Sequence, residues 1–187
     1  MGNRLTKIYT RTGDKGETGM ATGERVAKDS AIMHAQGDLD ELNSLLGLLA
    51  CKLDGEIAAD IKILQNDLFD LGGELSCRQP LIRQERIDWL EQTLDALNEA
   101  LPSLKEFILP GGGEAASLCH LARSVCRRAE RSLVAANREA EVSELLLAYI
   151  NRLSDLLFVM ARFITRQQGE TEVYWQSSRV SSQKEGE

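Results

Sequence analysis

The stretch LLLAYINRLSDLLFVMARFITRQQ, residues 145–168, decides the fold class of this 187-residue chain. Apolar side chains recur in it every three or four residues, at Leu146, Ile150, Leu153, Leu157, Met160 and Ile164. This spacing places them along one face of an α-helix, which at about 1.5 Å per residue is long enough to cross a small domain. The pattern therefore predicts an amphipathic helix from about Val142 to Gln168.

Four further stretches show the same helical periodicity. They are Ile32–Leu49, Ile57–Leu75, Ile87–Leu101 and Leu118–Ala136. Short connections between amphipathic helices favour antiparallel neighbours. We therefore expect an all-α fold, a five-helix up-and-down bundle that forms a single domain over residues 1–187. The polar end of the chain, about residues 177–187, is expected to be a disordered tail.

Composition agrees with a helical fold and limits the kinds of partner. Hydrophobic residues make up 43% of the chain but aromatic residues only 5%, which favours helices over an aromatic-rich β-sandwich. The net charge of −7 is the opposite of what general nucleic-acid or anionic-membrane binding requires. No apolar run reaches the roughly 18 residues that span a bilayer, and residues 1–8 do not resemble a secretory leader. We expect a cytoplasmic protein that binds neither nucleic acid nor membrane.

The cysteines and histidines do not form a recognisable reactive or metal site. The four cysteines form no CxxC pair, and the two histidines, His34 and His120, are in no ExxH pair. These absences argue against a zinc site and a ferritin-like di-iron centre. We expect reduced thiols that are partly buried, and histidines that serve the helix surface or the core.

A glycine-rich segment precedes the first predicted helix, within residues 1–29. The stretch TRTGDKGETG, residues 10–19, contains three glycines, and such a loop can turn its backbone N–H groups toward an anion. Neither the GxxxxGK[ST] loop nor the GxGxxG motif is present. On its own the segment is equally consistent with a plain flexible N-terminus.

The fourth predicted helix contains a row of arginines in the stretch RSVCRRAER, residues 123–131. Arg123, Arg127 and Arg131 are spaced four residues apart and share one helix face, where like charges repel. The simple interpretation is a solvated charged face. Because guanidinium groups match phosphate oxygens, the alternative is a site for a polyanion such as a triphosphate.

Polar residues on two other helices are candidates to meet these arginines. Asn151, Asp155 and Arg162 fall on one side of the fifth predicted helix. Asp155 is expected either to pair with an arginine of the fourth helix or to help orient a nucleotide or its Mg²⁺. The run GDLDELNS, residues 37–44, adds acidic side chains to the first helix.

Taken together and in order, these segments resemble the PduO-type corrinoid adenosyltransferases. The segments that carry the resemblance are IYTRTGDKGETG (8–19), DELNSLLG (40–47), FILPGGG (107–113), RSVCRRAER (123–131) and INRLSDLLFVMAR (150–162). The resemblance extends from Lys7 to Trp175. It implies a homotrimer with active sites between adjacent subunits. It also implies transfer of the 5′-deoxyadenosyl group of ATP to cob(I)alamin, which yields adenosylcobalamin and triphosphate.

The resemblance also implies roles for individual residues. The implied catalytic residues are Arg127, Arg131, Arg123, Asp40 and Phe107. In this scheme Asp40 pairs with Arg123 across the subunit interface, and Phe107 displaces the lower nitrogen ligand of the corrinoid. The implied ATP-binding residues are Thr10, Arg11, Thr12, Gly13, Asp14, Lys15, Gly16, Lys28, Arg128, Glu130 and Asn151. Asp155 would then orient an arginine.

The resemblance further implies Mg²⁺ held mainly by the ATP phosphates, with no assignable protein ligands. It also implies a reductase that forms cob(I)alamin from cob(II)alamin and an adenosylcobalamin-dependent enzyme that uses the product. The main alternative is a non-catalytic adenosylcobalamin carrier, which would need no triphosphate site. A structural trimeric bundle with a degenerate site would have lost the arginines or the glycine loop, and both are present. We therefore expect an enzyme, a corrinoid adenosyltransferase.

Overall fold

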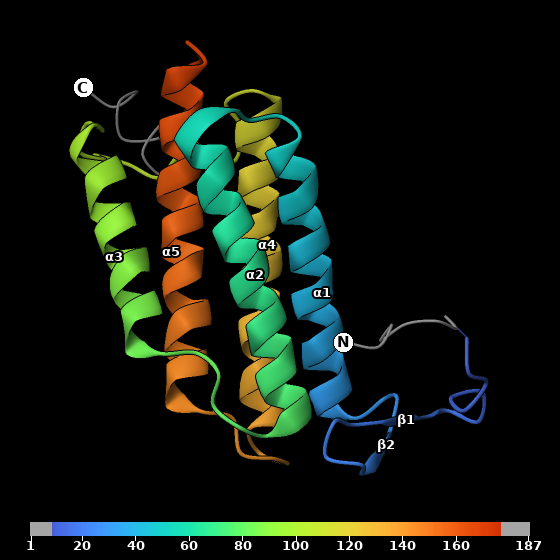
Figure 1. Ribbon diagram of the computed structural model, residues 1–187. Coiled ribbons are helices and arrows are strands. Elements are labelled where there is room, and N and C mark those ends of the chain that lie inside the picture. Colours follow the sequence, from blue (N-terminus) through green and yellow to red (C-terminus); the bar gives the residue numbers. More distant parts are fainter. Residues whose placement is uncertain (1–8, 177–187) are drawn as a thin grey trace, which may run out of the picture.

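The computed structural model describes residues 9–176 and confirms the expected five-helix bundle (Figure 1). The helices are α1 (Ala31–Ala50), α2 (Gly55–Cys77), α3 (Gln84–Glu99), α4 (Glu114–Ala136) and α5 (Glu144–Gln167). Consecutive helices run in opposite directions, so the up-and-down topology is also confirmed. The expected tail at 177–187 and the first eight residues of the N-terminal loop lie outside the described residues.

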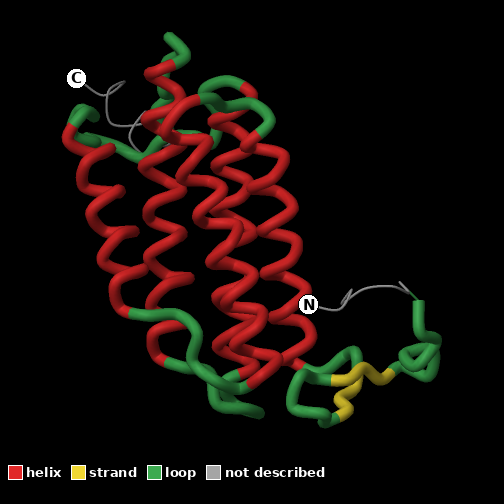
Figure 2. Tube along the Cα trace, viewed as in Figure 1, coloured by secondary structure: helices red, strands yellow, loops and turns green. Residues whose placement is uncertain are grey.

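The glycine-rich segment contains a small hairpin that the sequence did not predict (Figure 2). Strands β1 (Glu17–Gly19) and β2 (Arg25–Ala27) pair antiparallel, with Thr18 opposite Val26. Three-residue strands offer too few positions for an alternating pattern to be visible in the sequence. The hairpin projects beyond α1, on the side away from α3 and α5.

Helix α4 is central to the bundle because it packs against both α1 and α5. Helix α3 packs on the other flank of α5, and α2 packs on α1. The periodic leucines and isoleucines predicted from the sequence form a single buried core, and small residues such as Ala122 and Ala129 face it from α4. None of the helices in the described range is both long enough and apolar enough to cross a membrane.

A close backbone contact fixes the start of α4 against the end of α5. Gly112 has a φ of +93°, and a Cβ atom there would lie 2.2 Å from Oγ1 of Thr165. Only glycine permits both the backbone conformation and the close approach. The FILPGGG segment is therefore a tightly seated corner and not a loose linker.

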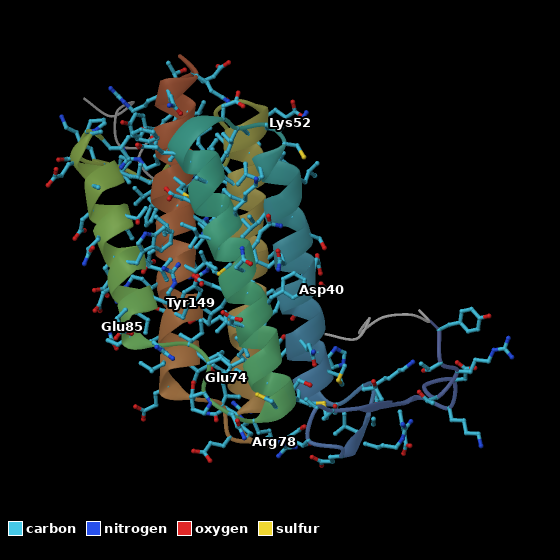
Figure 3. The ribbon with its side chains drawn as sticks, in the orientation of Figure 1. Asp40, Lys52, Glu74, Arg78, Glu85 and Tyr149 are labelled. Atoms are coloured by element: carbon cyan, nitrogen blue, oxygen red, sulfur yellow. The ribbon has the colours of Figure 1, made fainter. Side chains whose placement is uncertain are left out.

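A buried polar cluster joins α2, α3 and α5 through Asp67, Arg86 and Tyr149, of which Tyr149 is labelled in Figure 3. Asp67 of α2 receives two hydrogen bonds from Nε and one from Nη2 of Arg86 in α3, the shortest at 2.6 Å. It also accepts a hydrogen bond of 2.7 Å from the hydroxyl of Tyr149 in α5. Burial, together with the Asp67 charge, raises the pKa of Tyr149, so this phenol stays protonated and acts as a donor.

We predict that Asp67→Ala lowers the free energy of unfolding by about 3 kcal/mol, because it leaves Arg86 and Tyr149 without their buried acceptor. Asp70→Ala, an exposed carboxylate on the same helix, should cost less than about 0.5 kcal/mol. Urea unfolding followed by circular dichroism measures both. Equal, small losses would show that the cluster does not hold the three helices together.

Candidate active site

The N-terminal loop is folded around the side chain of Lys28. A Cβ atom at Gly13 would lie 3.0 Å from Nζ of Lys28, so the absence of a side chain there leaves room for the ammonium group. The backbone N–H of Lys28 donates to the carbonyl of Gly16 at 2.8 Å. Gly16 itself has a φ of +85°, a conformation that favours glycine. The structure thus brings together Gly13, Gly16 and Lys28, which the resemblance assigned to the ATP loop.

The remaining loop residues lie around this turn. The hydroxyls of Thr10 and Thr12 are 2.9 Å apart, and the carbonyl of Thr12 accepts from Arg25 at 2.8 Å. Arg11 has a left-handed φ of +60° and its guanidinium lies over the ring of Tyr9. Asp14 and Lys15 are exposed at the tip. The loop therefore presents backbone groups and two lysines, Lys15 and Lys28, to solvent in a compact arrangement suited to an anion.

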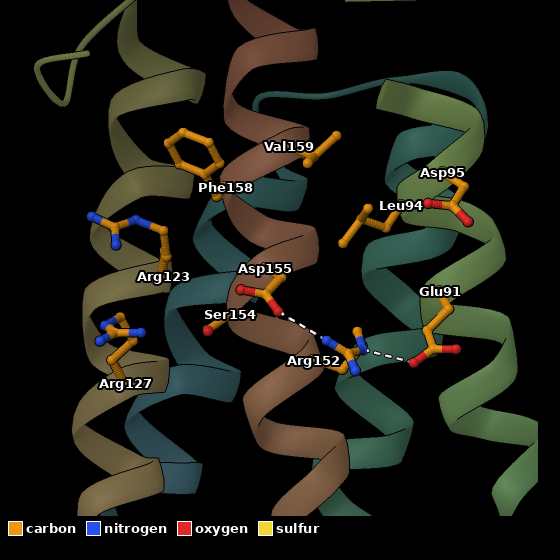
Figure 4. Close-up of a pocket in the computed structure, with 10 residues that line it drawn as sticks. All are labelled: Glu91, Leu94, Asp95, Arg123, Arg127, Arg152, Ser154, Asp155, Phe158 and Val159. Atoms are coloured by element: carbon orange, nitrogen blue, oxygen red, sulfur yellow. Dashed lines mark hydrogen bonds and ion pairs between the residues drawn. The ribbon is translucent and has the colours of Figure 1, made fainter. Parts of the chain in front are cut away.

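A cavity of about 510 Å³ lies between α3, α4 and α5 (Figure 4). Arg123 and Arg127 line it from α4, and Asp155, Phe158 and Val159 line it from α5. In Figure 4 Phe158 and Val159 lie above Ser154, Asp155 and Arg127, while Leu94 and Asp95 lie together on α3. The cavity therefore offers both cationic and apolar surface.

The arginines of α4 lie on two faces of the helix. Arg131 continues the row of Arg123 and Arg127, and its Nη1 donates to the backbone carbonyl of Arg127 at 2.9 Å. Arg128 points instead toward α1, where its Nε bonds Asp38 at 3.0 Å and its Nη2 forms a short ion pair with Glu41. The expectation that the acidic residues of α1 meet the arginines of α4 is confirmed for this arginine.

Two residues assigned to nucleotide binding meet across the α4–α5 packing. Nδ2 of Asn151 donates to Oε1 of Glu130 at 2.8 Å. Asn151 precedes Asp155, which lines the cavity, by one turn on α5, and Glu130 follows Arg127 by three residues on α4. Both therefore lie on the side of the helix pair that carries Arg127. The hydrogen bond fixes the orientation of the Asn151 amide and leaves its carbonyl oxygen available to a ligand.

Asp155 pairs with an arginine, but not with one of the fourth helix as the sequence suggested. Asp155 pairs with Arg152 of its own helix at 3.1 Å, not with an arginine of α4. Arg152 also bonds Glu91 of α3 at 2.8 Å, so it bridges two walls of the cavity. Sequence reasoning missed both residues. Glu91 on α3 has no local signal that points to a partner on α5, whereas the i,i+3 spacing of Arg152 and Asp155 was a signal present in the sequence.

Arg162 was expected on the polar side of α5 and is instead buried. Its Nε bonds Glu172 at 2.6 Å and its Nη2 bonds the carbonyl of Pro102 at 2.9 Å. It therefore belongs to the packing of the chain end, not to the cavity.

Arg123 and His120 leave buried polar atoms without a hydrogen-bond partner. These atoms are Nε of Arg123 and Nδ1 of His120, both within the described part of the chain. Burial, with the nearby Arg123 charge as a second cause, lowers the pKa of His120, so the imidazole is neutral at pH 7. Buried donors are normally satisfied, so Nε of Arg123 is able to bond an acceptor that the described residues of its own chain do not provide.

Asp40 and Phe107 lie away from the cavity in a single chain. Asp40 is exposed on α1 (Figure 3) and lines a shallow groove between α1 and α2. Phe107 is 77% exposed on the connection between α3 and α4. One chain therefore does not bring together Asp40 and Arg123, although the resemblance pairs them.

The comparisons with known proteins identify the class. Residues 8–164 match the cobalamin adenosyltransferase family. The chain therefore belongs to this family. A cobalamin adenosyltransferase from Cupriavidus metallidurans is 50% identical over 184 residues, which cover 97% of this chain and all of that protein. A corrinoid adenosyltransferase from Bacillus subtilis is 41% identical over 93% of this chain and 94% of its own length.

Solved structures agree with the sequence comparison. A variant of the PduO-type ATP:corrinoid adenosyltransferase from Lactobacillus reuteri, complexed with cobalamin and ATP, superposes with a TM-score of 0.85 at 33% identity. The match covers 91% of this chain and all of that one. The PduO-type resemblance and the enzyme class inferred from the sequence are confirmed.

The thiols do not take part in the site. Cys119 and Cys126 are fully buried and donate to backbone carbonyls of α5, and burial raises the pKa of the Cys119 thiol to about 12. The expectation of unpaired thiols is confirmed for all four cysteines, although Cys51 is exposed.

We predict that iodoacetamide at pH 8 modifies Cys51 in the native protein within the time in which Cys119 and Cys126 stay unmodified, because alkylation requires an accessible thiolate. Peptide mass spectrometry gives the extent at each position. The same reaction in guanidinium chloride is the control and should modify all three. Rapid native modification of Cys119 would contradict the buried position of α4 against α5.

Proposed function

We propose that this chain transfers the 5′-deoxyadenosyl group of ATP to cob(I)alamin, producing adenosylcobalamin and triphosphate. The observation that carries the proposal is the α4 arginine row beside a cavity with an apolar end, in a member of the cobalamin adenosyltransferase family. A triphosphate leaving group and a flat, largely apolar corrin ring require these two kinds of surface. A carrier of finished adenosylcobalamin would have no use for the arginines.

The chemistry places few demands on proton transfer. The electron pair of Co(I) forms the bond to the 5′ carbon, and the pair of the broken C5′–O bond leaves with the triphosphate. No proton has to be removed from the nucleophile, so the enzyme needs in-line placement and stabilisation of the departing charge. Arg127 and Arg131 are suited to the second task, since guanidinium groups stay charged and donate to two phosphate oxygens at once.

Glu130 and Asn151 serve the nucleotide in this proposal. Their mutual hydrogen bond of 2.8 Å holds the Asn151 amide in one orientation toward the arginine face. Arg128 pairs with Asp38 and Glu41 and so holds α4 against α1. In this proposal it affects ATP binding either through that helix placement or by leaving these carboxylates and binding ATP directly. Among the described residues no group of His, Cys, Asp and Glu is arranged to hold a metal ion, so Mg²⁺ would enter with the ATP phosphates.

The site is completed by a second copy of the chain in this proposal. The loop with Lys15 and Lys28 projects beyond α1, whereas the cavity opens among α3, α4 and α5 on the other side (Figures 1 and 4). The hydrogen bonds that join the loop to the bundle, at Ser76 and Arg78, lead to α2. In a cyclic trimer the loop of one subunit can close over the arginines of the next.

Asp40 and Arg123 would form the polar contact between copies. Asp40 is exposed, and Arg123 has a buried Nε without an acceptor among residues 9–176 of its own chain. Phe107 would press on the lower face of the corrin and displace the axial nitrogen, which makes the cobalt easier to reduce. A reductase, a downstream adenosylcobalamin-dependent enzyme and a cytoplasmic location complete the proposed setting.

We predict that Arg127→Ala lowers kcat/KM for ATP by about 100-fold or more, the range seen when a preorganised charge-stabilising donor is removed. Arg138→Ala, an exposed arginine beyond the end of α4, is the matched control and should retain full activity. Adenosylcobalamin formation is followed by visible absorbance under anaerobic conditions. Wild-type turnover in Arg127→Ala would overturn its assignment to the phosphates.

Mixed oligomers test whether two chains share one site. Lys15→Ala and Arg127→Ala, each expected to be inactive, are coexpressed with different tags and purified as mixed trimers. Each mixed trimer contains one interface with an intact loop facing an intact arginine row, so about one third of the wild-type activity should return. Mixed trimers without activity would mean that loop and arginines of the same chain act together.

A further inference from the structure

The α3–α4 connection and the end of the described chain form a two-stranded ribbon. Ile108 and Tyr174 form an antiparallel bridge. The N–H of Leu109 donates to the carbonyl of Val173 at 2.7 Å, and the N–H of Trp175 donates to the carbonyl of Phe107 at 2.7 Å. We call residues 107–109 and 173–175 the terminal ribbon.

One face of the terminal ribbon is apolar and open to solvent. Side chains alternate along a strand, so Phe107, Leu109, Val173 and Trp175 share the face opposite to Ile108 and Tyr174. All four are exposed, with Phe107 at 77% and Trp175 at 48%. Grouped exposed apolar side chains of this kind mark a binding surface.

The rings of Phe107 and Trp175 are a cross-strand pair. Their centroids are 6.4 Å apart and their planes meet at 66°, an edge-to-face arrangement. Such pairs are favourable beyond the area that they bury. Since Phe107 is the more exposed ring, the contact with Trp175 restrains its orientation without covering it.

The terminal ribbon is fastened to the bundle from beneath. Arg162 of α5 is 3% exposed and bonds both Glu172 and the carbonyl of Pro102. Pro102 precedes the first strand of the ribbon and Glu172 precedes the second. Gly112 seats the connection against Thr165 of the same helix. The backbone of both strands is therefore fixed, so the Phe107 orientation depends on its neighbour in the ribbon.

We propose that Trp175 is a positioning residue that sets the orientation of Phe107 toward the corrin ring, so that the chain end is part of the corrinoid site. This inference rests on the proposed function, and in particular on Phe107 displacing the lower axial nitrogen. Trp175 does not act on the cobalt; it keeps the Phe107 ring where it excludes the nitrogen ligand.

The test measures the coordination of the bound cobalt directly. Full-length protein is given cob(II)alamin and MgATP without reductant, and electron paramagnetic resonance gives the four-coordinate fraction of the bound pool. Trp175→Ala should lower the ratio of four- to five-coordinate cobalt roughly two- to tenfold, the range of one aromatic pair. Phe107→Ala defines the floor, and Trp175→Phe should restore a value near wild type.

Tyr174→Ala is the matched control, because Tyr174 is 44% exposed on the same strand but on the other face of the ribbon. It should leave the four-coordinate fraction unchanged. Turnover with reduction in place should fall in Trp175→Ala while the KM for ATP stays the same. If Trp175→Ala lowers the unfolding midpoint, the four-coordinate fraction is measured in Trp175→Leu instead, because leucine keeps apolar bulk without the ring. A lowered fraction in that variant supports the inference, and an unchanged fraction contradicts it.

Three results would overturn the inference: an unchanged four-coordinate fraction in Trp175→Ala, an equal loss in Tyr174→Ala, or weaker corrinoid binding with an unchanged fraction in the bound pool. Wild-type protein that makes no adenosylcobalamin would overturn the proposed function as well. Active wild-type protein with an unaffected Trp175→Ala variant overturns this inference alone.

Discussion

The mutual repulsion of Arg123, Arg127 and Arg131 on one face of α4 is the constraint on which the rest of the structure depends. Like charges at this spacing weaken an isolated helix, so α4 is held by its packing between α1 and α5 and not by its own charge pattern. Among residues 9–176 no carboxylate forms an ion pair with the row: Asp38 and Glu41 bind Arg128, and Asp155 binds Arg152. In the proposed function the row is then free to bind an anion from outside the chain.

The two halves of the proposed site are prepared in separate places. At one side of the bundle the loop turns tightly around Lys28, and at the other the cavity combines the arginines with Phe158 and Val159. Each half is built locally, by glycine conformations in the loop and by helix packing at the cavity. In the proposed trimer, the binding of ATP would depend on correct assembly, because each subunit would contribute only one half of the site.

The fold was predictable because it depends on the spacing of apolar residues along the sequence and on the length of each periodic stretch. Leucine and isoleucine spacing predicted all five helices and their antiparallel order, whereas the β1–β2 hairpin and the pairing of Ile108 with Tyr174 were missed. The site was predictable in part: Lys28 and the loop glycines do meet, as do Glu130 and Asn151. The partners of Arg128 and Arg162 depend on how segments far apart in sequence pack, which a single-helix pattern does not contain. The pair of Asp155 with Arg152 is local, at i,i+3 spacing on one helix, and was open to prediction from the sequence. An α-helix turns by about 100° per residue, so Arg128 faces a different direction from Arg127. The sequence therefore already contained the signal that separates Arg128 from the arginine row.

The most direct test of the account is an anaerobic reaction of purified protein with chemically reduced cob(I)alamin and MgATP, with both products measured. The account predicts loss of the cob(I)alamin absorbance with one triphosphate released for each adenosylcobalamin formed. Corrinoid binding without any spectral change would contradict it, and would leave the chain as a carrier whose arginine row serves structure alone.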